Sequence, residues 1–272
     1  GGTPVQLYDQ ARDGVVDIVW TLPGSTAGRC PRIEVFELPF MMNNAEATSK
    51  AYWEYFQTQC PDEFKETQVL ALHVHGPGMF HTSNKPVNKA ADLKGMKLRG
   101  PTRQVTKMLG SLGAIPVGMP LPQIPDALSK GTIEGCVIPW EVVPSVKVHE
   151  LTKFHSEFPA GTPALYTTTF VMAMNKAKYD SLAPELKKVI DANSGQALSG
   201  TVGKAFLAAD GVGKKLTEKN AHNVIPAAEL QAWKKVGEQV TNDWVADVTA
   251  KGANGKQLLE NARALIAKHA TQ

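Results

Sequence analysis

Short strand-like runs of apolar residues alternate along this chain with longer segments of helical periodicity. This alternation predicts an α/β fold. The strand-like runs are residues 15–20, 69–74, 96–99, 115–117, 135–138, 168–174 and 224–225. Helical patterns cover residues 46–59, 103–112, 123–129, 230–248 and 258–267. We expect a further long helix to begin at Pro184 and to include Ala197.

The size of the chain predicts two domains that share a cleft. With 272 residues it exceeds one average domain, and its hydrophobic content of 43% is ordinary for a globular protein. The sequence has no internal repeat, low-complexity tract or flexible linker. We therefore expect strands and helices that cross directly from one domain to the other.

The composition argues against several classes of function. A net charge of +3, without a basic run that includes aromatic residues, gives no reason to expect a nucleic-acid partner. No apolar stretch is long enough to span a membrane. Cys30, Cys60 and Cys136 show neither a CxxC motif nor the spacing of metal ligands. Cys30 and Cys60 could pair in an oxidising compartment, but three unpaired buried thiols are the favoured interpretation.

The segment from Arg99 to Arg103 has the features of an anion site. A strand ends at Arg99, a Gly-Pro turn follows, and a helix begins at Thr102. A helix start offers free N–H groups and a positive dipole end, and Arg99 can hold a carboxylate through two parallel hydrogen bonds. Arg103 in the first helical turn opposes the dipole, and a bound anion would resolve this conflict. The spacing equally allows both arginines to be solvated or paired with nearby carboxylates.

His73 and His75 form an HxH pair whose side chains share one face of a strand, an arrangement that some metal sites use. No carboxylate or cysteine lies at matching spacing, so structural or cleft-lining histidines are favoured and no metal is expected. The glycines of residues 76–78 do not belong to a phosphate-binding loop. The chain shows no nucleophile motif and no cofactor fingerprint, so we expect neither an enzyme nor a cofactor, although a catalytic triad can assemble from distant residues.

A series of motifs runs in order along nearly the whole chain. The most specific motif is Asp92-Leu-Lys-Gly-Met-Lys-Leu-Arg99. The others include Phe36-Glu-Leu-Pro-Phe40, Thr82-Ser-Asn-Lys-Pro86, Leu112-Gly-Ala114, Met119-Pro120, Glu134-Gly135, Phe170-Val-Met172 and Leu182-Ala-Pro-Glu185. Together these motifs resemble the periplasmic solute-binding proteins of TRAP transporters, the DctP family.

The resemblance implies a TRAP-type periplasmic binding protein fold, in which two α/β domains with mixed sheets are joined by crossing strands and a long interdomain helix. Residues 1–76 and 165–204 are assigned to domain I, and residues 77–164 and 205–272 to domain II, with the ligand cleft between them. Family members normally carry a strand–helix–strand unit before the segment that matches Gly1, so domain I is expected to be incomplete. A periplasmic monomer with two membrane partners, a small DctQ-like and a large DctM-like subunit, is also expected.

The resemblance also bears on the ligand. In this family the arginine at the position of Arg99 binds the substrate carboxylate. Many dicarboxylate and sialic-acid binders have a second arginine where this chain has Met79, and an asparagine where it has Ile138. The residues expected to form apolar walls instead are Met79, Phe80, Met119, Leu121, Ile138 and Trp140. Such a pocket suits a monocarboxylate with an apolar or aromatic body.

The remaining candidates for the cleft supply polar or aromatic contacts, namely Trp20, Thr102, Arg103, Glu141, Tyr166 and Thr168. Glu141 can accept a hydrogen bond from a ligand hydroxyl, with an exposed glutamate as the alternative, and Trp20 has a core tryptophan as its alternative. We expect aromatic or branched acids, such as benzoate, mandelate or benzoylformate types, ahead of short aliphatic hydroxy or sugar acids. A ligand-sensing module with the same fold is the alternative to a transport component.

Overall fold

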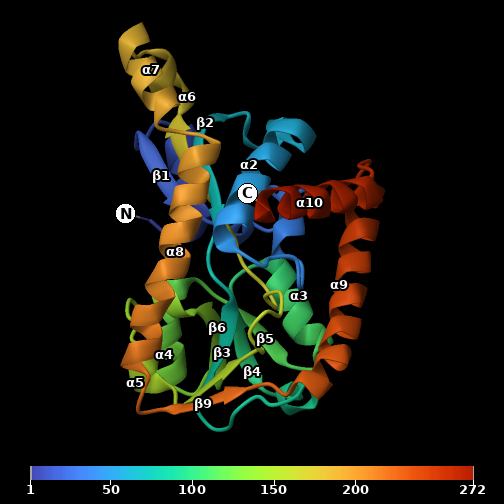
Figure 1. The fold of residues 1–272 in the computed structure, drawn as a ribbon. Helices are drawn as coiled ribbons and strands as arrows, with labels where there is room; N and C mark the ends of the chain where they lie inside the picture. Colours follow the sequence, from blue (N-terminus) through green and yellow to red (C-terminus); the bar gives the residue numbers. More distant parts are fainter. Residues whose placement is uncertain (1, 272) are drawn as a thin grey trace.

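The protein consists of two lobes, each built around its own β-sheet, as the computed structural model shows for residues 2–271 (Figure 1). Helices accompany both sheets, which confirms the predicted α/β fold class. Gly1 and Gln272, the outer limits of the predicted domains, lie outside the described residues.

The smaller sheet has three antiparallel strands. β8 (Thr169–Asn175) lies at its centre, between β1 (Ile18–Thr21) and β2 (Thr67–Val74). β8 is an almost continuous buried run, as expected for a central strand with both faces covered. α1 (Pro4–Arg12) packs against β1, and α2 (Ala45–Gln59) packs against β2.

The larger sheet combines parallel and antiparallel pairs. Its strands lie in the order β5 (Ile115–Gly118), β4 (Lys97–Gly100), β6 (Gly135–Pro139), β3 (Gly78–Thr82), β7 (Phe154–Glu157) and β9 (Ala221–Val224). β4 runs parallel to β5 and β6, while β3 is antiparallel to β6 and β7. α3 (Arg103–Ser111) connects β4 to β5, and α4 (Ile124–Ser129) connects β5 to β6, which gives the βαβ units typical of parallel pairs.

Short helices complete the connections. Two of them are the α-helices α5 (Val148–Leu151) and α6 (Lys176–Asp180). The 3₁₀ turns are η1 (Pro23–Ser25), η2 (Ile33–Glu37), η3 (Pro61–Phe64), η4 (Ala90–Leu93), η5 (Leu121–Gln123), η6 (Trp140–Val142) and η7 (Ala227–Glu229). Sequence periodicity did not predict α1, β3 or β7, because each is short and lacks a clear amphipathic or alternating pattern.

Several segments cross between the lobes. Residues 75–77 lead from β2 into β3, and residues 158–168 lead from β7 into β8. α8 (Gln196–Leu216) runs along both lobes as a 21-residue helix about 30 Å long (Figure 1). α9 (Leu230–Ala250) and α10 (Gly255–Ala270) then return the chain from the lower lobe in Figure 1 to α2 of the upper lobe. α8 is the expected interdomain helix, and residues 75–77 and 158–168 are the expected crossing connections, although they are not in strand conformation.

The prediction of one continuous helix that begins at Pro184 and includes Ala197 is wrong. The chain forms two helices there, α7 (Pro184–Ala192) and α8, which are separated at Gly195. Gly195 has a φ angle of +89°, in the left-handed region that favours glycine, and its N–H donates to the carbonyl oxygen of Leu70 at 2.7 Å. As a result α7 projects away from the upper lobe, while α8 follows both lobes (Figure 1).

α8 approaches the larger-sheet lobe closely because it carries a glycine at the contact. A Cβ atom added at Gly213 would lie 1.9 Å from the carbonyl oxygen of Trp140 in η6. The helix backbone therefore rests directly on η6, and a side chain at this position would force the two elements apart.

The contacts of α10 bear on the limits of the domains. Glu54 of α2 accepts a hydrogen bond from Lys268 at 2.7 Å and lies 2.8 Å from Nε2 of His269. Residues 255–270, which the predicted division assigns to domain II, thus pack against an element of domain I. The division itself stays a prediction.

All three cysteines are buried free thiols. Burial raises the pKa of Cys136 to about 12, and burial also raises the pKa of Cys30 and of Cys60. The favoured interpretation of three unpaired thiols is confirmed, and Cys30 and Cys60 do not form a disulfide.

Candidate ligand-binding site

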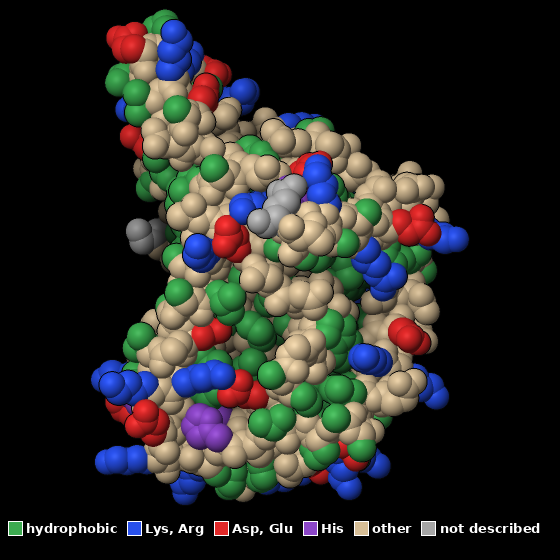
Figure 2. All heavy atoms as spheres, viewed as in Figure 1, with side chains coloured by type: hydrophobic (Ala, Val, Ile, Leu, Met, Phe, Trp, Pro, Cys, Tyr) green, Lys and Arg blue, Asp and Glu red, His purple; other side chains and the backbone are tan. Residues whose placement is uncertain are grey.

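A cavity of about 420 Å³ lies between the two lobes. This volume is within the range of about 300–1,000 Å³ that is typical of small-molecule sites. In the space-filling view the outline of the molecule narrows between the lobes, and charges of both signs are intermixed on the visible face (Figure 2). The cavity is mostly apolar, and among the described residues of its lining Arg99 and Glu141 are the charged ones.

Arg99 projects from the end of β4 and is 4% exposed. Its Nε donates to the carbonyl oxygen of Met119 at 3.0 Å, and its Nη1 donates to that of Val137 at 3.4 Å. These bonds orient the guanidinium, whose Nη2 donates no hydrogen bond to a described residue. Burial lowers the pKa of Arg99, and no carboxylate in residues 2–271 forms a salt bridge with it. The buried cation is therefore uncompensated, a condition that favours an anionic ligand.

Tyr166 lines the cavity and carries a hydroxyl group without a partner in residues 2–271. Its side chain is buried, and its hydroxyl has no hydrogen-bond partner among the described residues. The ring lies directly over Gly78, where an added Cβ atom would come within 2.0 Å of it. Burial raises the pKa of Tyr166, so the hydroxyl keeps its proton. An unpaired buried hydroxyl is unfavourable, and a ligand oxygen would satisfy it.

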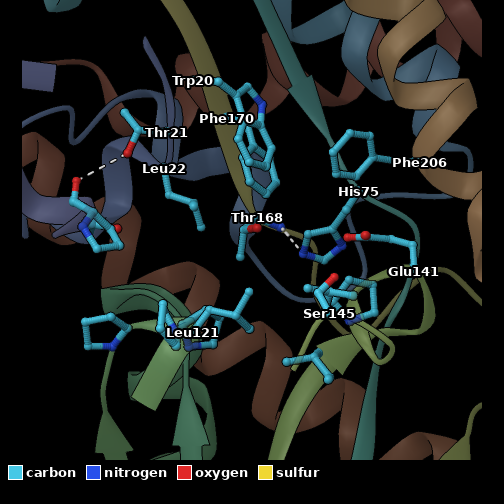
Figure 3. Close-up of a pocket in the computed structure, with 18 of the residues that line it drawn as sticks. Trp20, Thr21, Leu22, His75, Leu121, Glu141, Ser145, Thr168, Phe170 and Phe206 are labelled. Carbon is cyan, nitrogen blue, oxygen red and sulfur yellow. Dashed lines mark hydrogen bonds between the residues drawn. The ribbon is translucent and has the colours of Figure 1, made fainter. Parts of the chain in front are cut away.

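Aromatic rings form one wall of the cavity. Trp20 of β1 and Phe170 of β8 lie face to face, with ring centroids 4.8 Å apart and planes within 3° of each other (Figure 3). Phe206 of α8 lies 5.8 Å from each of these rings. Leu121 and Ile138 line the cavity from the other lobe. This arrangement suits a flat apolar group between the lobes.

Glu141 of η6 supplies the acidic group in the lining. Burial, and secondly repulsion from Asp210 of α8, raises the pKa of Glu141 to about 7. The backbone N–H of Glu141 donates to Oδ1 of Asp210 at 3.0 Å, and burial raises the pKa of Asp210 to about 6. The carboxyl group of Glu141 is partly buried and points into the cavity (Figure 3). The alternative of an exposed glutamate is therefore wrong.

The two histidines of the HxH motif have distinct partners. The indole N–H of Trp20 donates to Nε2 of His73 at 2.7 Å. The backbone N–H of Thr168 donates to Nε2 of His75 at 3.1 Å, as Figure 3 shows. The Nδ1 atom of each ring faces the carbonyl oxygen of the next residue. Burial lowers the pKa of His73 to about 4 and that of His75 to about 3. Both rings are therefore neutral, and their lone pairs are already engaged.

A metal site is accordingly not formed by this motif. In the part of the chain that the structure describes, no group of three or more histidine, cysteine, aspartate or glutamate residues is arranged to hold a metal ion. His75 instead lines the cavity, and His73 lies behind it.

The structure brings together some of the predicted site residues but not others. The cavity lining includes Trp20, Arg99, Leu121, Ile138, Glu141, Tyr166 and Thr168. Outside this lining lie Met79, Phe80, Thr102, Arg103, Met119 and Trp140.

The two residues at the start of α3 contact buried carboxylates of η2. Arg103 forms a bidentate pair with Glu34, at 3.1 Å from Nε to Oε1. Thr102 donates its hydroxyl proton to Glu37 at 2.7 Å, and Glu37 also accepts hydrogen bonds from Thr169 of β8. Pairing with a nearby carboxylate, one of the two possibilities left open by the spacing, thus holds for Arg103 but not for Arg99.

The other four residues are occupied elsewhere. Met79 and Trp140 border a separate recess beside α8. Phe80 packs against Trp233 in the core, with ring centroids 5.7 Å apart. The backbone carbonyl of Met119 accepts a hydrogen bond from Arg99, and Met119 also borders a neighbouring recess.

Sequence reasoning missed Phe170, Phe206 and Ser145 as lining residues. Phe170 could have been predicted, because residues two apart on a strand share a face and Thr168 was already a candidate. Phe206 gave no such signal, since its place in the cavity depends on how α8 crosses both lobes.

Residues 2–247 match the profile of the DctP family, described as bacterial extracellular solute-binding protein, family 7. This match covers most of the chain, so the protein belongs to the DctP family of TRAP solute-binding proteins. None of the helices in residues 2–271 is long and apolar enough to cross a membrane.

Two solved structures of TRAP solute-binding proteins are especially similar. One, from Rhodoferax ferrireducens T118 in complex with copurified benzoate, is 66% identical with a TM-score of 0.98, and the match covers 100% of this chain and 85% of that one. The second, from a marine metagenome and described as specific for aromatic acid ligands, contains 3-hydroxybenzoate. It is 49% identical with a TM-score of 0.96, over 99% of this chain and 84% of that one.

A curated relative is more distant. The 2,3-diketo-L-gulonate-binding periplasmic protein YiaO of Escherichia coli is 27% identical over 203 residues, which cover 72% of this chain and 59% of that protein.

Proposed function

We propose that this protein captures an aromatic monocarboxylate between its lobes and delivers it to the membrane permease of a TRAP transporter. The observation that carries the proposal is Arg99, a buried guanidinium without an acidic partner among the described residues, at the edge of an apolar cavity. A ligand carboxylate at Arg99 neutralises this charge and uses the N–H donors that the protein leaves free.

The remaining lining residues define how such a ligand binds. The carboxylate accepts hydrogen bonds from Arg99 and from the hydroxyl of Tyr166. The ring of the ligand lies between the wall formed by Trp20 and Phe170 and the apolar surface that includes Ile138 on the other lobe. A second carboxylate would be buried against this surface without a cationic partner, at a cost of several kcal/mol.

The ligands of the two similar structures support an aromatic acid. Benzoate and 3-hydroxybenzoate each combine one carboxylate with a flat ring. The hydroxyl of 3-hydroxybenzoate-like acids would find an acceptor in Glu141, which has no side-chain hydrogen bond within residues 2–271.

Membership of the DctP family supports a role in transport rather than in catalysis. The protein acts in the periplasm, where closure of the lobes over the ligand produces the form that docks on the small and large membrane subunits. The free protein is mostly open, and ligand contacts with both lobes stabilise the closed form. The ligand is released chemically unchanged.

Two measurements test this proposal. Mass spectrometry of the small molecule that copurifies with the protein should reveal an aromatic monocarboxylate. A thermal-shift screen should show stabilisation by benzoate, mandelate or benzoylformate and none by succinate or malate, because a ligand that binds the folded state raises its unfolding temperature. Stabilisation by the dicarboxylates alone would contradict the proposal.

A further inference from the structure

We propose that His73 is a positioning residue that contributes to ligand selectivity. Its hydrogen bond to Trp20 holds the indole ring in the orientation in which the aromatic wall contacts a ligand. This inference rests on the proposed binding of aromatic acids. His73 is buried and does not line the cavity, so any effect on the ligand must pass through the lining rings that it contacts, which are Trp20, Phe170 and Phe206.

The register of the smaller sheet brings the three rings together. Trp20 on β1 pairs with Met172 of β8, and His73 on β2 pairs with Phe170 of β8. Phe170 and Met172 are two residues apart on the central strand, so their side chains share one face of the sheet. The side chains of Trp20 and His73 therefore project from the same face as that of Phe170.

The direction of the hydrogen bond between Trp20 and His73 follows from chemistry. An indole nitrogen can only donate, so Nε2 of His73 must be the acceptor in the 2.7 Å contact. Nδ1 of His73 then carries the proton and donates it to the carbonyl oxygen of Val74 at 3.2 Å. The backbone of β2 thus fixes the tautomer that Trp20 requires.

The ring geometry shows what this hydrogen bond achieves. The planes of Trp20 and His73 are within 6° of each other, and their centroids are 6.0 Å apart, so the two rings lie edge to edge in one plane. Phe170 is parallel to both, with its centroid 4.8 Å from Trp20 and 4.7 Å from His73. The joined rings therefore form a single flat surface against which Phe170 stacks.

Trp20 needs this support because it is the exposed member of the group. It is 43% exposed, whereas His73 and Phe170 are buried. Without the acceptor on His73, the indole N–H can bond to water and the ring is free to leave the plane of the wall. A flat ligand loses stacking contacts when the indole ring leaves this plane. A branched aliphatic ligand is less affected, because the hydrophobic effect that holds it does not depend on ring orientation.

Three variants separate the hydrogen bond from the ring. His73→Phe keeps an aromatic ring but removes the acceptor, His73→Gln keeps an acceptor but removes the ring, and Trp20→Phe removes the donor. Calorimetry with benzoate and with 3-methylbutanoate should show that His73→Phe weakens benzoate binding about three- to tenfold, the usual effect of one hydrogen bond. Binding of 3-methylbutanoate should change less than about twofold.

The other variants provide the controls. His73→Gln should bind benzoate within about threefold of the wild type. The double variant with Trp20→Phe and His73→Phe should bind benzoate no more weakly than Trp20→Phe alone, because the two substitutions remove the same interaction. Equal losses for both acids in His73→Phe, without rescue by His73→Gln, would overturn the inference.

A measurement without ligand distinguishes this inference from the proposed function. In ¹H–¹⁵N spectra of the free protein, the indole resonance of Trp20, identified by its loss in Trp20→Phe, should exchange slowly with water, and the exchange should become fast in His73→Phe. Fast exchange in the wild type would overturn the role of His73 even if benzoate binds. Failure of the wild type to bind any aromatic acid, with a protected indole, would overturn the proposed function instead.

Discussion

Replacement of Arg99 is the most direct test of the binding site. The guanidinium is 4% exposed, and its protein contacts are two backbone carbonyls, those of Met119 and Val137. In Arg99→Ala the ligand carboxylate would be buried without a cation. Removal of one partner from such a buried pair costs about 3–5 kcal/mol, which corresponds to a loss of affinity of about a hundredfold to several thousandfold.

The size of this effect can be compared with the contribution of the ring. Burial of about 100 Å² of apolar ring surface at about 25 cal/mol per Å² contributes about 2.5 kcal/mol. The carboxylate contact is therefore expected to dominate the affinity. Arg99→Lys should also lose at least about tenfold, because an ammonium group cannot form the two parallel hydrogen bonds of a guanidinium.

The fold should survive these replacements. The buried charge of Arg99 has no carboxylate partner in the described residues, so its removal relieves a desolvation cost while it leaves two carbonyl groups unpaired. We expect the free energy of unfolding of the free protein to change by less than about 1 kcal/mol.

The assay is titration calorimetry with benzoate, with circular dichroism to confirm folding. Arg103→Ala is the matched control, because Arg103 lies four residues away and pairs with Glu34 outside the cavity. Its benzoate affinity should stay within about threefold of the wild type. A folded Arg99→Ala variant that loses less than tenfold in affinity would refute the assignment of Arg99 as the carboxylate anchor.

Three further predictions follow from the structure. Because burial raises the pKa of Glu141 to about 7 and a bound anion favours its protonated form, the affinity for benzoate should fall as the pH rises from about 6 to about 8. Calorimetry across this range should show a weaker pH dependence for Glu141→Gln, in which the neighbouring Asp210, with a pKa of about 6, still titrates. A fall of equal steepness in that variant would contradict this role. Arg103→Ala should lower the free energy of unfolding by about 1–3 kcal/mol, because it leaves the buried Glu34 without its ion pair. Urea denaturation measures this change, and unchanged stability would contradict a stabilising role of the Arg103–Glu34 pair. Gly213→Ala should lower the free energy of unfolding by about 1–3 kcal/mol, because the Cβ atom of the new alanine would overlap the backbone of η6. Gly211→Ala is the control on the same helix and should not destabilise the protein, because the space around Gly211 is open.

The sequence alone determined the features of this protein that depend on local pattern. The alternation of strand-like runs and helical spacing predicted the α/β class and most of the elements, since periodicity reports which face of an element is buried. The position of Arg99, at the end of a strand before a helix start, was likewise visible. The motifs that surround it indicated the family, which the profile match confirms.

Features that depend on contacts between distant segments were decided by the tertiary structure. Spacing could not separate Arg99 from Arg103, because the difference lies in Glu34, a buried carboxylate almost 70 residues away that pairs with Arg103 and not with Arg99. The single helix expected after Pro184 is divided at Gly195, where the chain bonds to the edge of β2.

The aromatic wall shows the same limit. Its rings come from β1, β8 and α8, with His73 of β2 packed behind them, and their order along the chain carries no sign that they meet. The spacing of the HxH motif is one that some metal sites use, although the sequence favours cleft-lining or structural histidines. The register of the smaller sheet sets Trp20 beside His73 and so engages the lone pair that a metal would need. Local spacing predicts which side chains share a face of an element, whereas strand order and register determine which of these side chains are in contact.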